Sequence, residues 1–126
     1  MEKINRSKER IDRNGEVFTP PKLVQRMLDQ LDIDWDNPPQ DKTFLDPTCG
    51  DGNFLYEIST RGIPIHNVYG VDLMEDNVRV CRARLLEVYG DTPENRQVLE
   101  DNIVCANALT YHYCFKDGEG LENLLQ

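Results

Sequence analysis

Residues 44–55, Phe44-Leu45-Asp46-Pro47-Thr48-Cys49-Gly50-Asp51-Gly52-Asn53-Phe54-Leu55, join a short apolar run to a loop with two glycines and then to a helical apolar pattern. Residues 43–46 predict a short strand, and residues 54–58 predict one face of a helix that ends at Gly62. Glycine lets the backbone approach a ligand closely, and a helix N-terminus offers unpaired N–H groups. Because ligands bind at the carboxyl ends of parallel strands, this segment predicts a ligand site.

The same alternation of strands and helices continues on both sides of this segment. A helix is expected on 20–31, with Thr19 as its N-cap, followed by a polar connector on 32–42. Further on, we expect a strand on 67–72, a helix on 75–89, a short helix from Thr92-Pro93 and a strand on 103–106. Strands that alternate with helices predict an α/β fold of Rossmann-like type, with a parallel sheet and right-handed crossovers.

The composition fits one modest globular domain and excludes a two-domain enzyme. The chain has 126 residues, 14 Lys and Arg against 23 Asp and Glu, and a formal net charge of −9. It shows neither an apolar run that could span a bilayer nor a signal peptide, so we expect a cytoplasmic protein without a membrane contact. Four cysteines and two histidines without paired spacing predict free thiols rather than a zinc site or disulfides.

The charge is unevenly distributed along the chain. Residues 1–26 hold seven basic and four acidic side chains, whereas residues 27–126 hold seven basic and nineteen acidic ones. We expect residues 1–14 to form a basic arm that touches a phosphate backbone or is simply a solvated tail. Residues 15–126 are expected to form a single domain, too acidic to bind a DNA duplex unaided.

Two carboxylates at predicted strand ends indicate which ligand the site takes. A dinucleotide motif would place a third glycine where Leu55 stands, and Asp46 would repel a pyrophosphate. A carboxylate there suits a cationic group, such as the ammonium and sulfonium of S-adenosylmethionine. Asp72, 20 residues after Gly52, can accept ribose hydroxyls, with Leu73 beside it to pack against the base. The pattern therefore predicts a nucleoside-cofactor site.

Three segments resemble motifs of the N6-adenine DNA methyltransferases of restriction-modification systems, which use S-adenosylmethionine. Residues 15–21 resemble the F-T-P segment, which implies that Phe18 packs on the cofactor and Thr19 holds its methionine carboxylate. Residues 45–55 resemble the D-P-x-x-G-x-G-x-F motif around the methionine moiety, and residues 69–73 resemble the ribose-binding motif. The cofactor-binding residues that the resemblance implies here are Asp46, Pro47, Gly50, Gly52, Phe54, Asp72 and Leu73.

A weaker match lies at residues 103–109, where the family has Asp-x-Leu and this chain has Asn107. The resemblance implies that this side chain accepts a hydrogen bond from the adenine amine of the cofactor. An amide oxygen can still accept that bond, so Asn107 is also expected at the cofactor.

The catalytic motif of the family, (Asp/Asn)-Pro-Pro-(Tyr/Phe), has no match in a comparable place. Asn37-Pro38-Pro39 is followed by Gln40 and lies in the polar connector, so we interpret it as a loop and assign no catalytic residue. The chain resembles a shortened methyltransferase, incomplete after the third strand, similar to small methylase-like proteins of bacterial viruses. The alternating residues 109–115 are expected either to supply a substitute strand or to pack in the core.

Three functions remain open from the sequence. The first is an S-adenosylmethionine-binding unit, inactive alone, that a second copy or a complementing methyltransferase chain completes. The second is a non-catalytic module that binds the cofactor or a methylase, as in phage-type interference with host modification. The third is an enzyme acting on the cofactor or a small molecule, with Asp46, Asp51 or Tyr111 near the reactive end.

Overall fold

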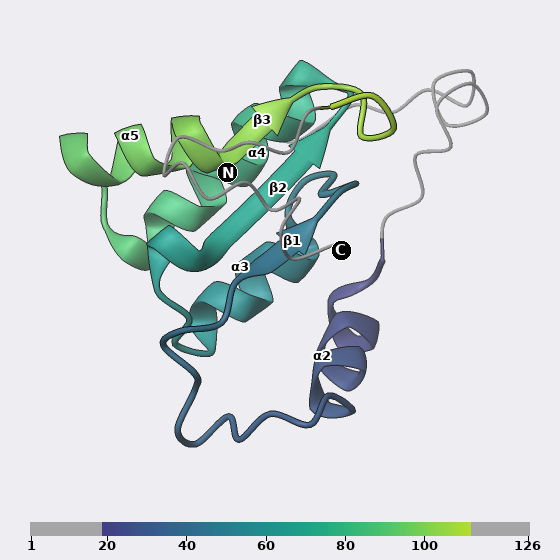
Figure 1. Cartoon of the computed structure of the whole chain (residues 1–126), viewed down its shortest axis with the longest axis vertical. Coiled ribbons are helices and arrows are strands. Elements are labelled where there is room, and N and C mark those ends of the chain that lie inside the picture. The colour runs from purple at the N-terminus through teal and green to yellow at the C-terminus, as the bar shows by residue number, and fades with distance from the viewer. Residues whose placement is uncertain (1–18, 112–126) are drawn as a thin grey trace.

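Three short parallel strands form the sheet at the centre of residues 19–111, the part of the chain that the computed structural model describes. The elements are α2 (Pro21–Asp29), β1 (Phe44–Asp46), α3 (Asn53–Thr60), the 3-10 turn η1 (Ile65–Asn67), β2 (Val68–Asp72), α4 (Glu75–Tyr89), α5 (Pro93–Asn102) and β3 (Ile103–Cys105). The order is β1-β2-β3, with Leu45 opposite Tyr69 and Val71 opposite Val104 (Figure 1). The predicted α/β fold with a parallel sheet is confirmed.

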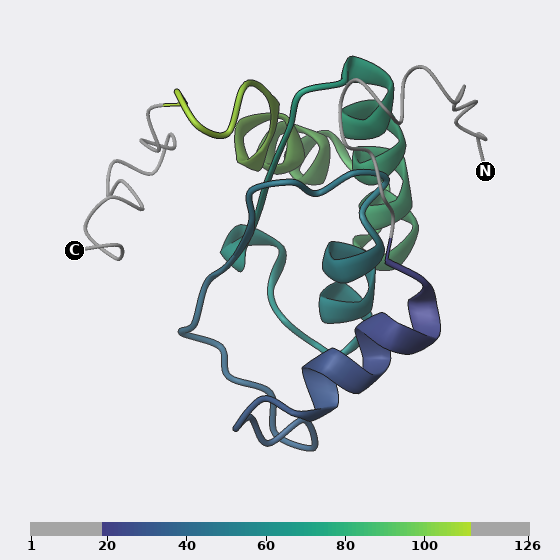
Figure 2. The same ribbon diagram turned by 90° about the vertical axis from the view of Figure 1, so that its right-hand side faces the viewer.

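The helices that follow β1 and β2 cover one face of this sheet. Figure 2 shows α3 and α4 on the same side of the strands, with α2 packed against α3. Both crossovers lead in the same direction across the sheet, and right-handed crossovers then place their helices on one face. The main core lies in this layer and includes Val24, Leu55, Val68, Leu85 and Ile103, all buried.

A second, smaller cluster lies on the opposite face of the sheet. It consists of Tyr69 and Val71 of β2, with Leu45 and Val104 from the neighbouring strands packed against them. Because successive side chains of a strand point to opposite faces, β2 contributes to both clusters. The central strand β2 is therefore buried from both sides, and the loop after β1 is bonded to it near its carboxyl end.

Two glycines allow the loop after β1 to lie close to its neighbours. A Cβ atom on Gly70 would lie 2.8 Å from Cδ1 of Leu55, so only glycine lets α3 sit this close to β2. A Cβ atom on Gly52 would lie 2.7 Å from Sγ of Cys81 in α4, and Gly52 has φ +91°. Because these two glycines carry no Cβ atom, α3 packs closely against β2 and the loop packs closely against α4.

The helix predicted on 20–31 differs from the structure at both ends. It ends at Asp29, its N-cap is Pro20 and not Thr19, and among residues 19–111 no side chain caps it. The carbonyl of Pro20 accepts the N–H of Val24 at 3.0 Å, and Pro21 supplies the preset φ of the first helical position, so the helix begins one residue later.

Of the two alternatives for residues 109–115, a substitute strand is wrong for the first residues, whereas Tyr111 packs against the cluster of Tyr69 and Val71, as the core alternative expects. The carbonyl of Asn107 accepts the N–H groups of Thr110 and Tyr111, which makes a turn, and Leu109 is 96% exposed. The remaining positions of that prediction, 112–115, lie outside the described residues, as do Phe18 and the proposed basic arm 1–14.

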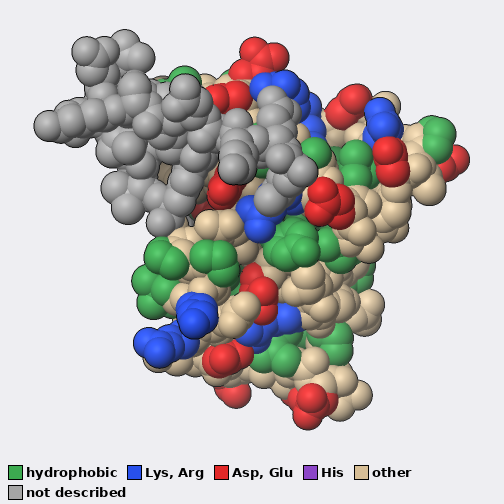
Figure 3. Space-filling view, turned by 180° about the vertical axis from the view of Figure 1, so that it is seen from behind, with side chains coloured by type: hydrophobic (Ala, Val, Ile, Leu, Met, Phe, Trp, Pro, Cys, Tyr) green, Lys and Arg blue, Asp and Glu red, His purple; other side chains and the backbone are tan. Residues whose placement is uncertain are grey.

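The surface of the helix layer mixes acidic and basic side chains, as Figure 3 shows from behind. Three apolar side chains of α2 and its end remain largely exposed, namely Leu23, Met27 and Leu31. Among residues 19–111, no helix combines the length and apolar character that crossing a bilayer would need.

Candidate functional site

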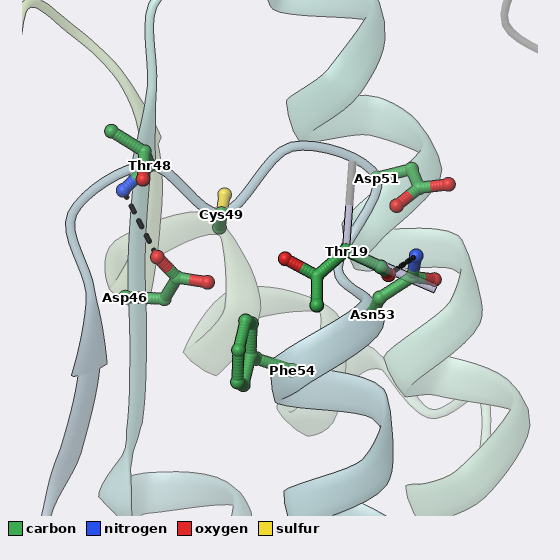
Figure 4. A pocket seen from close by; sticks show the side chains of 7 residues that line it. All are labelled: Thr19, Asp46, Thr48, Cys49, Asp51, Asn53 and Phe54. Carbon is green, nitrogen blue, oxygen red and sulfur yellow. Dashed lines mark hydrogen bonds between the residues drawn. The ribbon is translucent and has the colours of Figure 1, made fainter. Parts of the chain in front are cut away.

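A pocket of about 90 Å³ opens at the carboxyl end of β1, beside the start of α3. Its lining residues are Thr19, Asp46, Thr48, Cys49, Asp51, Asn53 and Phe54. Figure 4 shows the side chains of Asp46, Phe54 and Thr19 facing one another across it. Pockets for whole cofactors usually measure about 300–1,000 Å³, so this one can accept only part of a nucleoside cofactor.

The loop that forms the pocket is fixed by its own backbone bonds. Gly50 and Gly52 have φ angles of +54° and +91°, which turn the chain from β1 into α3. The N–H of Cys49 donates to the carbonyl of Val71 at 2.9 Å, and the N–H of Gly52 donates to the carbonyl of Cys49 at 2.8 Å. The loop is therefore anchored on β2 and is shaped before any ligand arrives.

Asp46 provides a half-buried carboxylate in the pocket. Burial raises the pKa of Asp46 and the neighbouring carboxylate of Asp72 adds to that increase, whereas hydrogen bonds from Thr48 lower it. The N–H of Thr48 donates to Oδ1 of Asp46 at 3.1 Å. A cation bound beside Asp46 would relieve the cost of its negative charge, so this end of the site favours a positively charged group.

Asp72 stands at the end of β2 and is held by three donors. Its Oδ1 accepts the N–H of Gly50 at 3.1 Å, and its Oδ2 accepts the N–H of Met74 at 3.0 Å and the side-chain amide of Asn77 at 2.8 Å. A carboxylate has about four acceptor positions. One position on Oδ1 therefore remains for a ligand hydroxyl without displacing any of these bonds.

Leu73 and Asn107 lie on the same side of the sheet end as Asp72. The N–H of Ala106 donates to the carbonyl of Asp72 at 2.9 Å, and the thiol of Cys105 donates to the carbonyl of Leu73 at 3.4 Å. Leu73 is 55% exposed, so its side chain offers an apolar surface. Oδ1 of Asn107 accepts the N–H of Leu109 at 3.0 Å, which leaves it one further acceptor position.

The predicted residues thus form two groups joined by one bond. The first group, around the pocket, includes Thr19, Asp46 and Phe54, and the second, at the ends of β2 and β3, includes Asp72, Leu73 and Asn107. The bond from Gly50 to Asp72 connects them. Pro47 is exposed in the turn after β1 and does not line the pocket.

Thr48, Cys49 and Asn53 also line the pocket, although the motifs did not single them out. All three lie within the opening segment 44–55, so their proximity to the site was visible in the sequence. The contacts that each of these side chains makes could not be predicted from the sequence. The side-chain amide of Asn53 donates to the carbonyl of Thr19 at 2.8 Å, across 34 positions of the chain.

The cysteines of the described residues carry free thiols. Cys49 and Cys81 are buried, and a hydrogen bond with Cys81, followed by burial, raises the pKa of the Cys49 thiol. Cys114 lies outside the described part. Over residues 19–111, no three His, Cys, Asp or Glu side chains are grouped so that they could hold a metal ion.

The segment Asn37-Pro38-Pro39-Gln40 lies in the connector between α2 and β1. The amide of Gln40 donates to the carbonyls of Pro38 and Gly62, at 3.0 and 3.3 Å. Gly62 follows the end of α3, whereas the pocket lies at its start. The eight-residue helix α3, about 12 Å long, therefore separates this segment from the pocket. This separation agrees with the interpretation of the segment as a connecting loop.

Comparison with known proteins gives the family. The family model for N-6 DNA methylases matches residues 4–107 of this chain. The Type II methyltransferase M.VspI of Vibrio sp. (strain 343) is 36% identical over 84 residues, which are 67% of this chain and 20% of that protein. The chain thus spans about a fifth of the length of this curated relative. Because the family model matches most of the chain, this chain belongs to the N-6 DNA methylase family.

Proposed function

We propose that this chain is the S-adenosylmethionine-binding unit of an N6-adenine DNA methyltransferase. The family generally uses this methyl donor. The observation that carries the proposal is the bond from the N–H of Gly50 to Oδ1 of Asp72, which joins a cation-favouring pocket to a hydroxyl acceptor. S-adenosylmethionine has a cationic amino-acid end and a neutral nucleoside end, and the two halves of this site match those two ends.

The amino-acid end of the cofactor fits the pocket at β1. Its ammonium and sulfonium groups would lie near the Asp46 carboxylate, which favours positive charge. The side chain of Thr19 faces the same pocket and can donate a hydrogen bond to the methionine carboxylate (Figure 4). Gly50 and Gly52 carry no Cβ atom, so the backbone can approach the ligand closely.

The nucleoside end fits the surface beside β2 and β3. The remaining acceptor position on Oδ1 of Asp72 takes one ribose hydroxyl. Leu73 offers apolar surface to the adenine base, and Asn107 lies two residues after the end of β3. Phe18, which the resemblance places on the cofactor, lies outside the described residues.

Methyl transfer would need a catalytic segment that the printed sequence does not contain. In the direct displacement, the adenine amine attacks the methyl carbon while the carbon–sulfur bond breaks and a neutral thioether leaves, and the methylated amine releases one proton to the completing segment or to water. This chain would contribute position and electrostatics to that step, rather than a base. The segment would come from the same longer polypeptide, from a second copy or from a complementing methyltransferase chain.

The outer edge of β1 is where such a segment would pair. Within residues 19–111, β1 has a strand partner on one side only, and an apolar pocket of about 240 Å³ lies beside it. Phe44, Leu45, Phe54 and Ile58 line this pocket, and Asp46 closes it toward the cofactor site. An unpaired strand edge accepts a further strand through its main-chain groups. DNA contact would fall to that partner or to the basic arm.

The test is transfer of a radioactive methyl group from S-adenosylmethionine to adenine-containing DNA. We expect no transfer with this chain alone, and transfer when a segment bearing the (Asp/Asn)-Pro-Pro-(Tyr/Phe) motif is supplied. Transfer by the chain alone would overturn the need for that segment. A chain that instead lowers the activity of an intact methylase, and is never activated, would favour the interference function.

A further inference from the structure

Arg84 of α4 does not line the cofactor pocket, yet its guanidinium contacts the loop that forms it. Its Nη1 donates to the carbonyl of Asp51 at 3.1 Å and to Oδ1 of Asn53 at 2.8 Å. Oδ1 of Asp51 lies 3.7 Å from the same nitrogen. The guanidinium carbon lies 4.6 Å from the ring centroid of Tyr56, and the Arg84 side chain is 12% exposed.

The contact with Arg84 fixes which way the amide of Asn53 faces. A guanidinium can only donate hydrogen bonds, so it needs the oxygen of that amide. The amide nitrogen then faces the opposite way and donates to the carbonyl of Thr19 at 2.8 Å. A carbonyl can only accept a hydrogen bond. If the amide of Asn53 were reversed, its nitrogen would face the donor of Arg84 and its oxygen would face the carbonyl of Thr19. The chain of hydrogen bonds from Arg84 through Asn53 to Thr19, called the relay below, therefore allows only one orientation of the Asn53 amide.

This relay ties together three elements that are distant in the sequence. Arg84 belongs to α4, Asn53 is the first residue of α3, and Thr19 precedes α2. Thr19, Asp51 and Asn53 all line the pocket, whereas Arg84 stands behind them. Loss of the guanidinium would release both the loop and the orientation of the amide that holds Thr19.

We propose that Arg84 is a positioning residue for the amino-acid end of S-adenosylmethionine. It holds Thr19 over the pocket through Asn53, and holds the loop through the carbonyl of Asp51. The inference rests on the proposed function, because it assigns Thr19 and the pocket to that end of the cofactor. Asp72, which would hold the nucleoside end, accepts the N–H of Gly50 in the same loop, but within residues 19–111 neither Asp72 nor Leu73 bonds to Arg84, Asn53 or Thr19.

The test compares two ligands that share the adenosine half and differ at the other end, where the first carries a sulfonium and an amino acid and the second a neutral methyl thioether. Calorimetry would measure binding of S-adenosylmethionine and of 5′-methylthioadenosine, which lacks the amino-acid portion, to the native chain and to Arg84→Met. We expect about tenfold weaker binding of S-adenosylmethionine, the scale of a lost charge-assisted hydrogen bond. The affinity for 5′-methylthioadenosine should stay within about twofold.

Arg82→Met is the matched control on the same helix. Arg82 donates through Nε to the carbonyl of Ile103 at 3.0 Å and does not line the pocket. This variant should leave both affinities unchanged. Arg84→Lys, which keeps the charge and one donor direction but not the planar group over Tyr56, should restore part of the lost affinity.

Asn53→Asp keeps the inference testable if Arg84→Met does not fold. Its carboxylate can still accept from Arg84, but it presents an oxygen instead of a donor to the carbonyl of Thr19. We expect the same selective loss of S-adenosylmethionine affinity.

Equal losses for both ligands would show a purely structural role for Arg84, and unchanged affinities would also overturn its positioning role. If the native chain binds neither ligand, the proposed function itself is wrong. If the native chain binds S-adenosylmethionine but these variants show no selective loss of affinity, the positioning role of Arg84 is wrong and the proposed function stands.

Discussion

The backbone N–H of Gly50 donates to Oδ1 of Asp72 at 3.1 Å, across 22 positions of the chain. Gly50 lies in the loop after β1, and Asp72 is the last residue of β2. Together with the pairing of β1 and β2 and the bond from Cys49 to Val71, this hydrogen bond holds the two halves of the site next to each other. It also gives Asp72 a structural role beside its proposed role as an acceptor of a ribose hydroxyl.

Replacing Asp72 by alanine should destabilise the fold as well as weaken cofactor binding. The change removes the acceptor of Gly50, Met74 and the fully buried Asn77. A lost hydrogen bond to a charged group costs about 1.5–3 kcal/mol, so we expect the free energy of unfolding to fall by about 2–4 kcal/mol. Urea denaturation measures this change.

Asp34→Ala is the control for that prediction. Asp34 also accepts a backbone N–H and a side-chain amide, those of Asp36 and Asn37, but it lies exposed in the connector. Its loss should change stability by less than about 0.5 kcal/mol. Equal destabilisation by both substitutions would contradict the claim that the hydrogen bonds of Asp72 hold the fold together at the end of β2.

Gly52→Ala should destabilise the chain more than Gly90→Ala. Both glycines have positive φ, +91° and +103°, so an added Cβ is strained at either position. At Gly52 it also meets Sγ of Cys81 at 2.7 Å, whereas at Gly90 the nearest atom, of Asn95, is 4.0 Å away. We expect losses of about 3 kcal/mol and about 1 kcal/mol respectively in urea denaturation.

The double variant Gly52→Ala with Cys81→Ala separates the two causes. It removes the contact with the sulfur but keeps the strained backbone. Its two changes should therefore destabilise by less than the sum of the single effects. Simple additivity would mean that the contact with Cys81 is not what requires glycine.

Asp46→Asn should make the chain more stable at neutral pH and a weaker binder of S-adenosylmethionine. The pKa of Asp46 is raised in the folded chain, mainly by burial. Its contribution to stability is therefore present below the unfolded pKa and is lost as pH rises through the folded pKa. Asparagine does not ionise and keeps an oxygen that can accept the N–H of Thr48.

Denaturation of both forms from about pH 4 to about pH 8, which brackets the carboxyl range, tests this sign. The free energy of unfolding of Asp46→Asn should exceed that of the native chain by more as pH rises. In the native chain a cationic ligand favours the ionised carboxylate, so binding should release protons and tighten over the same interval. A gap that narrows as pH rises would contradict the charge assigned to the pocket.

Cys105 should be the described cysteine that iodoacetamide alkylates first. It is exposed, whereas Cys49 and Cys81 are buried. Burial, followed by the charges of Glu75 and Asp72, raises the pKa of Cys105, so alkylation should accelerate with rising pH as thiolate forms. Mass spectrometry of the Cys114→Ser variant would measure the rate at each site.

The same reaction reports on the nucleoside end of the site. The thiol of Cys105 lies 3.4 Å from the carbonyl of Leu73, beside the surface assigned to adenine. S-adenosylmethionine should slow alkylation of Cys105, whereas methionine, which has no nucleoside, should not. Equal rates with and without S-adenosylmethionine would place the base elsewhere.

Much of the fold could be predicted because its boundaries rest on local signals. The helix predicted on 75–89 matches α4, which ends at Tyr89 and is followed by Gly90 with φ +103° as its C-cap. The strand before it ends at Asp72, as predicted. Apolar alternation and glycine stops are properties of neighbouring residues, so they are legible without knowledge of distant contacts.

The errors arise where a nearby group competes for the same backbone. Thr19 precedes two prolines, and the structure makes Pro20 the N-cap because Pro21 already fits the first helical position. Leu109 leaves the alternating pattern because Asn107 accepts from the following N–H groups and closes a turn. Asn and Asp compete in this way with regular structure.

The roles of Asn53 and Arg84 could not be predicted at all. Each bond of the relay joins residues 31 or more positions apart. Such bonds depend on how α2, α3 and α4 pack, which no local pattern encodes. The site motifs gave the position of the pocket but not the residues that support it.

Calorimetric titration of the native chain with S-adenosylmethionine tests the central claim most directly. We predict saturable heat at a single site, reduced strongly in Asp46→Asn, which keeps the shape of the pocket and removes the carboxylate at the end of β1. No saturable heat from the folded chain, or equal affinity in native and Asp46→Asn chains, would contradict the assignment of this site to the cofactor.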